Sequence, residues 1–182
     1  MDRLPEFVET PRLILRHWTE DDAVALAEAI EDSLDHLRPW MPWASDKPST
    51  PVDRIALIRQ WRADWEKGGD SFLGIFRQGE VVGGTGLHRS DSPDTVEIGY
   101  WIHVDHLRRG YATEATRALT EAAFEMPGID CVQIRHDKAN AASEGIPRSL
   151  GFTRLGERTV KKVAPAWSGR LVVWVKHRPD RQ

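Results

Sequence analysis

The feature that most constrains the fold is a run of short strand patterns that leads directly into one strong helix pattern. Residues 72–77, 81–89 and 95–104 are rich in apolar and β-branched side chains, and turn residues at 78–79 and 91–94 separate them. Strands joined by such short turns pair as an antiparallel meander. The chain therefore has to build a sheet at its centre and cover it with the elements on either side.

Helices and further strands surround this meander in an α/β pattern. Residues 112–126 form the clearest helix, because Ala115, Leu119 and Ala122 lie on one side of it. The other predicted elements are, in chain order, a strand within 7–18, helices at 19–37 and 52–67, a strand at 131–136, a helix at 141–150 and a closing hairpin of 152–163 with 171–176. We predict an α/β fold of the mixed-sheet (α+β) kind with about seven strands, in a single domain over residues 1–182.

Composition excludes several classes of function. The net charge of −3 provides no overall positive field that would gather nucleic acid or anionic lipid. No apolar run reaches membrane-spanning length, and the first residues lack the apolar stretch of a secretory signal. Cys131 is the single cysteine, which fits a reducing compartment, and His103 and His106 lack the spacing of metal ligands. We expect a cytoplasmic protein with no metal, no nucleic-acid partner and no membrane.

Residues 108–113, with the sequence Arg-Arg-Gly-Tyr-Ala-Thr, lie at a predicted join between a strand and a helix. The first N–H groups of a helix have no partner within the helix and carry a partial positive charge, so they bind phosphate oxygens. Gly110 lets the backbone approach a ligand closely, and Arg108 and Arg109 add cationic donors. Because a glycine before a helix is also an ordinary turn, the neighbouring segments have to decide between the two interpretations.

The join resembles the coenzyme-binding motif of the GCN5-related N-acetyltransferase (GNAT) superfamily, which has Gln or Arg, two residues, Gly, one residue, and Gly or Ala. Gly110 and Ala112 fit this motif, whereas Leu107 at its first position departs from it. Residues 140–143 (Asn-Ala-Ala-Ser) and 149–152 (Ser-Leu-Gly-Phe) resemble the second signature of the same family at matching spacing.

Two further segments, residues 97–101 and 37–43, resemble the RimJ/RimL-like branch, which acetylates protein N-termini and especially those of ribosomal proteins. The resemblance covers residues 10–175. It implies the GNAT fold, a mostly antiparallel sheet with flanking helices in which the fourth and fifth strands splay apart. The acyl-CoA thioester would enter the gap between these strands.

On that resemblance acetyl-CoA is the cosubstrate, and its contacts follow residue by residue. Backbone groups of Trp101, Ile102 and His103 would pair with the pantetheine arm, and one amide would polarise the thioester carbonyl. The residues expected to contact the cofactor are Trp101, Ile102, His103, Arg108, Arg109, Gly110, Tyr111, Ala112, Thr113 and Asn140. For Asn140, capping of the helix that follows is an equally good explanation.

Direct attack of an amine on a thioester needs an acid for the leaving thiolate and a route for the proton of the amine. Many family members place a tyrosine acid where this chain has Pro147, so Ser143 is the expected catalytic acid, as in the ribosomal-protein branch. Glu97 is the first candidate base, because a carboxylate within an apolar strand is costly unless it is paired or functional. A structural Glu97 is equally consistent with the sequence, and His136 and Asp137 follow as candidates.

The acceptor is constrained by the lack of an evident strong base. An α-amine with a pKa of about 8 is roughly one-tenth neutral at pH 7, whereas a lysine with a pKa of about 10.4 is neutral about once in 2,500. We therefore expect a peptide or protein N-terminus as acceptor.

Trp40, Met41 and Trp43 are the candidates for the floor of the acceptor pocket, with a small core beneath a long loop as the alternative. Small-molecule amines, a succinyl donor and a CoA-binding module without turnover also remain consistent with the sequence. Trp167 marks a turn that borders either the pocket or a homodimer contact.

Overall fold

A computed structural model describes residues 3–44 and 50–179 of the chain. In this part of the protein the strands are β1 Phe7–Glu9, β2 Ile14–His17, β3 Ser71–Arg77, β4 Glu80–Arg89, β5 Thr95–Ile102, β6 Cys131–Asp137, β7 Thr153–Thr159 and β8 Arg170–His177. The helices are α1 Ala23–Asp32, α2 Leu34–Leu37, α3 Pro51–Glu66, α4 Tyr111–Glu125 and α5 Ala141–Ser149, with short 3-10 turns η1 Glu20–Asp22 and η2 Val104–His106. None of these helices is long and apolar enough to cross a membrane.

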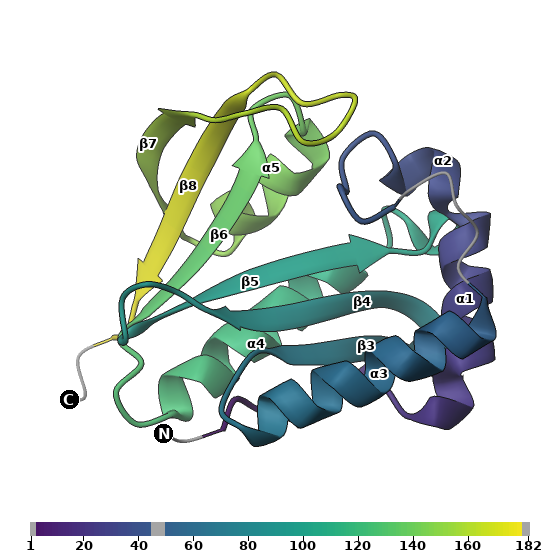
Figure 1. Ribbon diagram of the computed structural model, residues 1–182. Coiled ribbons are helices and arrows are strands. Elements are labelled where there is room, and N and C mark those ends of the chain that lie inside the picture. Colours follow the sequence, from purple (N-terminus) through teal and green to yellow (C-terminus); the bar gives the residue numbers. More distant parts are fainter. Residues whose placement is uncertain (1–2, 45–49, 180–182) are drawn as a thin grey trace.

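The strands form one mixed sheet in the order β1-β2-β3-β4-β5-β6-β8-β7 (Figure 1). All neighbours are antiparallel except β5 and β6, which confirms the predicted fold class. The described residues contain eight strands instead of about seven, because the strand expected within residues 7–18 is a hairpin. Its turn forms where the backbone N–H and the hydroxyl of Thr10 both donate to the carbonyl of Leu13, at 2.9 and 3.2 Å.

The single helix expected at residues 19–37 is divided into η1, α1 and α2. The last division falls at Ser33, which is fully buried and whose hydroxyl accepts a hydrogen bond from the backbone N–H of Val104 at 3.0 Å. A contact with the first residue of η2, just after β5, therefore accompanies the interruption of a segment whose own pattern is helical. After α2 the chain continues into residues 38–43, called the Trp40 segment.

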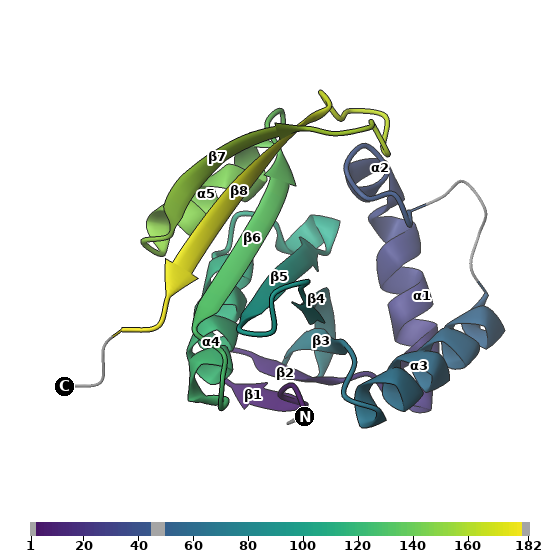
Figure 2. The ribbon, with the colours of Figure 1, turned by 60° about the vertical axis from the view of Figure 1, so that its left-hand side comes forward.

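Helices cover both faces of the sheet, with α4 and α5 on one face and α1 and α3 on the other (Figure 2). On the α4 side, Leu73, Ile75 and Ile98 pack in one core with Ala115 and Leu119 of the helix. A second core on the opposite face joins α1 and α3 to the sheet; it contains Trp18, Ala23, Leu26, Ala29, Ile30, Ile58, Phe76 and Val81. Each fully buried large aliphatic side chain contributes about 1.5–3 kcal/mol to this packing.

The sheet face toward α1 and α3 is rich in glycine. Gly74 pairs with Gly84, and Gly86 pairs with Gly99, so four neighbouring positions on β3, β4 and β5 carry no side chain. A Cβ on Gly84 would lie 2.4 Å from the indole nitrogen of Trp101, so a side chain at this position would collide with the Trp101 ring. The missing side chains leave space between the sheet and the helices.

The fold opens between β5 and β6. These strands pair only through Thr95, Val96 and Glu97 of β5, and beyond Glu97 they diverge, as Figure 1 shows. In contrast, β6 pairs with β8 from Cys131 to Asp137, along its whole length. One edge of β5 is therefore left without a strand partner beyond Glu97. This is the expected splay of the fourth and fifth strands, which are β5 and β6 here because the first strand is a hairpin.

Candidate active site

The open edge of β5 is the first part of the site. The N–H of His103 donates to the carbonyl of Val82 on the β4 side at 3.0 Å. Because backbone groups of successive residues point to opposite edges of a strand, Trp101 shares the β4 side, whereas Ile102 and Tyr100 face the gap. Among Trp101, Ile102 and His103, only Ile102 presents its backbone to the splay, so the expected backbone pairing of Trp101 and His103 with a pantetheine arm needs correction.

The second part is the N-terminus of α4. Gly110 has φ 81° and ψ 6°, a left-handed conformation that favours glycine, and its carbonyl accepts from the N–H of Glu114 at 3.0 Å. This is the first bond of the helix, so the N–H groups of Tyr111, Ala112 and Thr113 have no partner within the helix. Three aligned amides at the positive end of a long helix fit a pyrophosphate.

Arg12 braces this cradle from the β1–β2 hairpin. Its Nη1 donates to the carbonyl of Arg109 at 3.1 Å, its Nε lies 2.6 Å from Oε2 of Glu114, and its guanidinium lies 4.9 Å from the ring centre of Tyr111. Sequence reasoning missed Arg12, because nothing local links it to a turn so distant in the chain. Leu107 is partly buried against the core, which explains why an apolar residue is acceptable at the first motif position.

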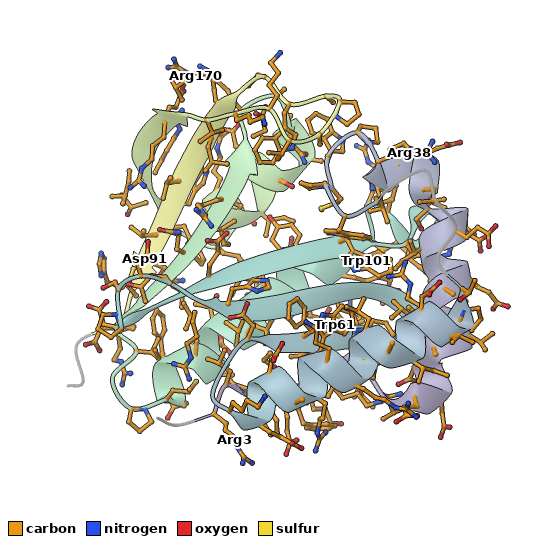
Figure 3. All side chains as sticks on the ribbon, in the orientation of Figure 1. Arg3, Arg38, Trp61, Asp91, Trp101 and Arg170 are labelled. Atoms are coloured by element: carbon orange, nitrogen blue, oxygen red, sulfur yellow. The ribbon has the colours of Figure 1, made fainter. Side chains whose placement is uncertain are left out.

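The third part is a cavity of about 560 Å³ between the glycine-rich sheet face, α1, α3 and the β6–α5 segment. Trp61 of α3 and Trp101 of β5, both labelled in Figure 3, come from two of its walls. Its aromatic lining residues are Trp18, Trp40, Trp43, Trp61, Phe72, Tyr100, Trp101 and Trp167. The expected acceptor residues Trp40, Met41 and Trp43 all lie in its wall.

The Trp40 segment is held in place by the loop between β7 and β8. The indole N–H of Trp167 donates to the carbonyl of Trp40 at 2.9 Å, and the N–H of Ala166 donates to the carbonyl of Pro39 at 3.0 Å. Trp43 packs edge-on against Trp101, with ring centres 6.1 Å apart. Trp167 therefore borders the cavity, which is one of the two positions that the sequence allows.

A polar group of side chains lies where the cavity meets the splay. Oδ1 of Asn140 accepts from the N–H of Ser143 at 3.1 Å, so Asn140 caps α5, and both residues line the cavity. The hydroxyl of Tyr100 donates to the carbonyl of Ser143 at 3.2 Å, and burial raises the pKa of Tyr100 above its ordinary value. Tyr100 was missed from the sequence, although its alternation with Trp101 along the strand places it toward the gap.

Glu97 lies at the last paired position of β5. Its Oε2 is 2.6 Å from Nη2 of Arg135 and accepts from Nε2 of Gln133 at 3.2 Å, so both its partners come from β6. The carboxylate thus joins the two strands at the point where they part. This position supports the structural alternative for Glu97, and a role as base stays a prediction.

The two other candidate bases are also engaged. The indole N–H of Trp174 donates to Nε2 of His136 at 3.0 Å, so the ring proton is on Nδ1, which lies 2.9 Å from the carbonyl of Asp137. The Asp137 carboxylate accepts from the N–H of Ala139 and from the N–H and hydroxyl of Ser168, all within 2.9 Å, and from the N–H of Gly169 at 3.1 Å. Burial alone would raise the pKa of Asp137, but these hydrogen bonds outweigh it and hold the pKa below its usual value.

Comparisons with known proteins agree on one family. A family model described as an acetyltransferase (GNAT) domain matches residues 12–153. The chain is 31% identical over 146 residues to YdaF of Bacillus subtilis (strain 168), named as a candidate ribosomal N-acetyltransferase, with 80% of each chain covered.

Solved structures have the same fold. RimJ of Mycobacterium smegmatis, in complex with a CoA disulfide, superposes with a TM-score of 0.86 at 19% identity and covers 95% of this chain and 88% of that one. RimL, a ribosomal L7/L12 alpha-N-protein acetyltransferase in complex with coenzyme A, gives a TM-score of 0.84 at 18% identity, with coverage of 97% and 98%.

Proposed function

The chain belongs to the GNAT acetyltransferase family and uses acetyl-CoA, and on this premise we propose that its acceptor is the N-terminal α-amine of a peptide or protein. One observation carries the proposal: Tyr100, Asn140 and Ser143 belong both to the wall of the cavity and to the mouth of the splay. An acceptor in the cavity would therefore reach the gap between β5 and β6, where we expect the thioester of acetyl-CoA to lie.

Acetyl-CoA supplies an acetyl group activated as a thioester. The amides of Tyr111, Ala112 and Thr113 would hold its pyrophosphate, and the backbone of Ile102 would pair with the pantetheine arm. Ser143, in the first turn of α5, is proposed to donate the proton to the leaving thiolate, with the Tyr100 hydroxyl beside it. The proton that the amine loses as it forms the amide then returns to the Ser143 oxygen, so the step is balanced. These roles need no covalent intermediate on the protein.

The three candidate bases are already hydrogen-bonded or ion-paired, which favours an α-amine as the acceptor. Glu97 is paired with Arg135, both ring nitrogens of His136 are engaged, and Asp137 holds four donors. An acceptor that is already partly neutral at pH 7 needs the least help from such a site, and an α-amine is roughly 250 times more often neutral than a lysine.

The lining also disfavours polycationic amines. Among the described residues that line the cavity, Asp137 is the single carboxylate, and its oxygens are already hydrogen-bonded. The names of YdaF and RimL point to ribosomal proteins as acceptors, so the proposal includes the cytoplasm as location. A homodimer remains a prediction.

The experiment measures free CoA thiol released from acetyl-CoA with purified protein. One acceptor is a lysine-containing peptide with a free N-terminus, and its matched control is the same peptide with a blocked N-terminus. Release with the free peptide and little with the blocked one supports the proposal. Equal release with both peptides, or release only with polyamines and other small amines, would overturn it, and succinyl-CoA as a second donor tests the acyl group.

A further inference from the structure

Arg54 is the residue of the cavity that the proposed reaction leaves unexplained. It lies in the first turn of α3, is half-buried, and lines the cavity together with Leu57 and Trp61. Within the residues that the structure describes, its Nε is buried and has no hydrogen-bond partner. A buried donor without an acceptor is unfavourable by about 1–3 kcal/mol or more for a charged group, so its presence calls for a partner.

The neighbouring carboxylates do not supply this partner. Asp53 accepts from the N–H and the hydroxyl of Thr50, at 2.9 and 2.7 Å, in the capping box that begins α3. Asp137, on the other side of the cavity, is hydrogen-bonded to the backbone of the 168–169 turn and the 137–139 turn. Both acids are thus committed to local structure.

Two other basic side chains of the cavity wall have acidic partners. Arg135 is paired with Glu97 at 2.6 Å, and His88 lies 2.9 Å from Asp70. Arg54 differs from them, since no acid within ion-pair distance is found for it in the described parts of the chain. The positive end of α3 adds to its charge, so neither helix stability nor a local ion pair explains an arginine here. Burial lowers the pKa of Arg54, and Asp53 only partly opposes this.

We propose that Arg54 is an anion subsite of the acceptor cavity, and that the preferred acceptor is a peptide with an acidic side chain close to its free N-terminus. The inference rests on the proposed function, because the amine must lie at the Tyr100 and Ser143 end. The planar guanidinium of an arginine matches a carboxylate through paired hydrogen bonds, which a lysine would not do. The aromatic walls between the two ends would hold the apolar parts of the first residues.

The test compares short peptides that begin with alanine and differ only in a Glu, Gln or Lys at the second or third position. The rate of thiol release from acetyl-CoA gives kcat/KM for each peptide. The wild-type protein is expected to prefer the Glu peptide over the Gln peptide by about tenfold. Arg54→Gln should lower kcat/KM for the Glu peptide about tenfold relative to the Gln peptide, so that the preference disappears, and Arg54→Glu should turn the preference toward the Lys peptide.

Arg59→Gln is the matched control on the same helix, because Arg59 pairs with Glu20 on the surface at 2.6 Å and does not line the cavity. It should keep the wild-type preference, and calorimetric binding of CoA shows that each variant is folded. Equal kcat/KM for the Glu and Gln peptides with wild type would overturn the anion subsite and leave the proposed function intact.

Two other outcomes separate the hypotheses. If Arg54→Gln slows all peptides alike, Arg54 has a structural role and the subsite is overturned. If the wild-type protein acetylates no peptide, or acetylates a small anionic amine faster than every peptide, the peptide acceptor itself is overturned.

Discussion

Replacement of Gly110 by alanine tests the cofactor cradle most directly. Gly110 has φ 81°, and a residue with a Cβ is destabilised in this conformation by about 1–2 kcal/mol. The nearest heavy atom to the added Cβ would be Nη2 of Arg12, at 3.4 Å, and a flexible side chain can move by a few tenths of an ångström. Backbone strain rather than collision therefore dominates, and we expect Gly110→Ala to lower the free energy of unfolding by about 1–2 kcal/mol.

The same strain affects binding. Rotation of residue 110 toward a relaxed conformation turns the N–H groups of Tyr111, Ala112 and Thr113 away from their common direction. Loss of one hydrogen bond to a charged phosphate is worth about 1.5–3 kcal/mol, which corresponds to roughly a ten- to hundredfold weaker affinity for CoA. Titration calorimetry with CoA measures this change, and urea unfolding measures the change in stability.

Gly79→Ala is the matched control. Gly79 has φ 84°, nearly the same strain, but it lies in the turn between β3 and β4, and a Cβ there would have nothing within 4 Å. It should lose comparable stability and keep the wild-type affinity for CoA. If Gly110→Ala binds CoA as tightly as Gly79→Ala does, the helix amides are not the pyrophosphate site and the reasoning is refuted.

Three further changes test other parts of the protein. Ser143→Ala should lower kcat of thiol release by about a hundredfold without changing CoA affinity, because a general acid contributes at least this much; an unchanged kcat would direct attention to Tyr100. Hydrogen bonds from Lys138, Arg154 and Arg170 lower the pKa of Glu157 from 4.5 to about 2, and the bond from Lys138 has the largest effect. The stabilisation by the ionised Glu157 is therefore complete above about pH 4.5 and is lost as the pH falls toward 2. The difference in unfolding free energy between wild type and Glu157→Gln should be larger at about pH 6 than at about pH 3. A difference that does not change with pH would contradict this. Asp137→Asn should cost about 2 kcal/mol in urea unfolding, because an amide nitrogen would face backbone donors, and an unchanged midpoint would show that these hydrogen bonds contribute little.

The sequence alone determined the fold class, the family resemblance and the position of the strand-to-helix join at Gly110, where the pyrophosphate cradle stays a prediction. These properties depend on local patterns: alternation in strands, apolar spacing in α4, and a glycine at a strand-to-helix join. Local patterns also predicted α3 to within one residue at each end. The structure shows the local reason, since the Thr50 capping box and Pro51 begin the helix and the 67–69 turn ends it.

Only the tertiary structure decided what each polar side chain does. Glu97 forms an ion pair with Arg135 across the splay, and Asn140 caps α5. The N–H of His103 donates to the carbonyl of Val82. These partners depend on strand register and on how α5 follows β6. Arg12 contacts the start of α4 and Arg54 lines the cavity because hairpin and helix packing brought them there from distant parts of the chain. A sequence pattern reports the neighbours of a residue along one element, whereas partners across elements are set by how the whole sheet and its helices pack.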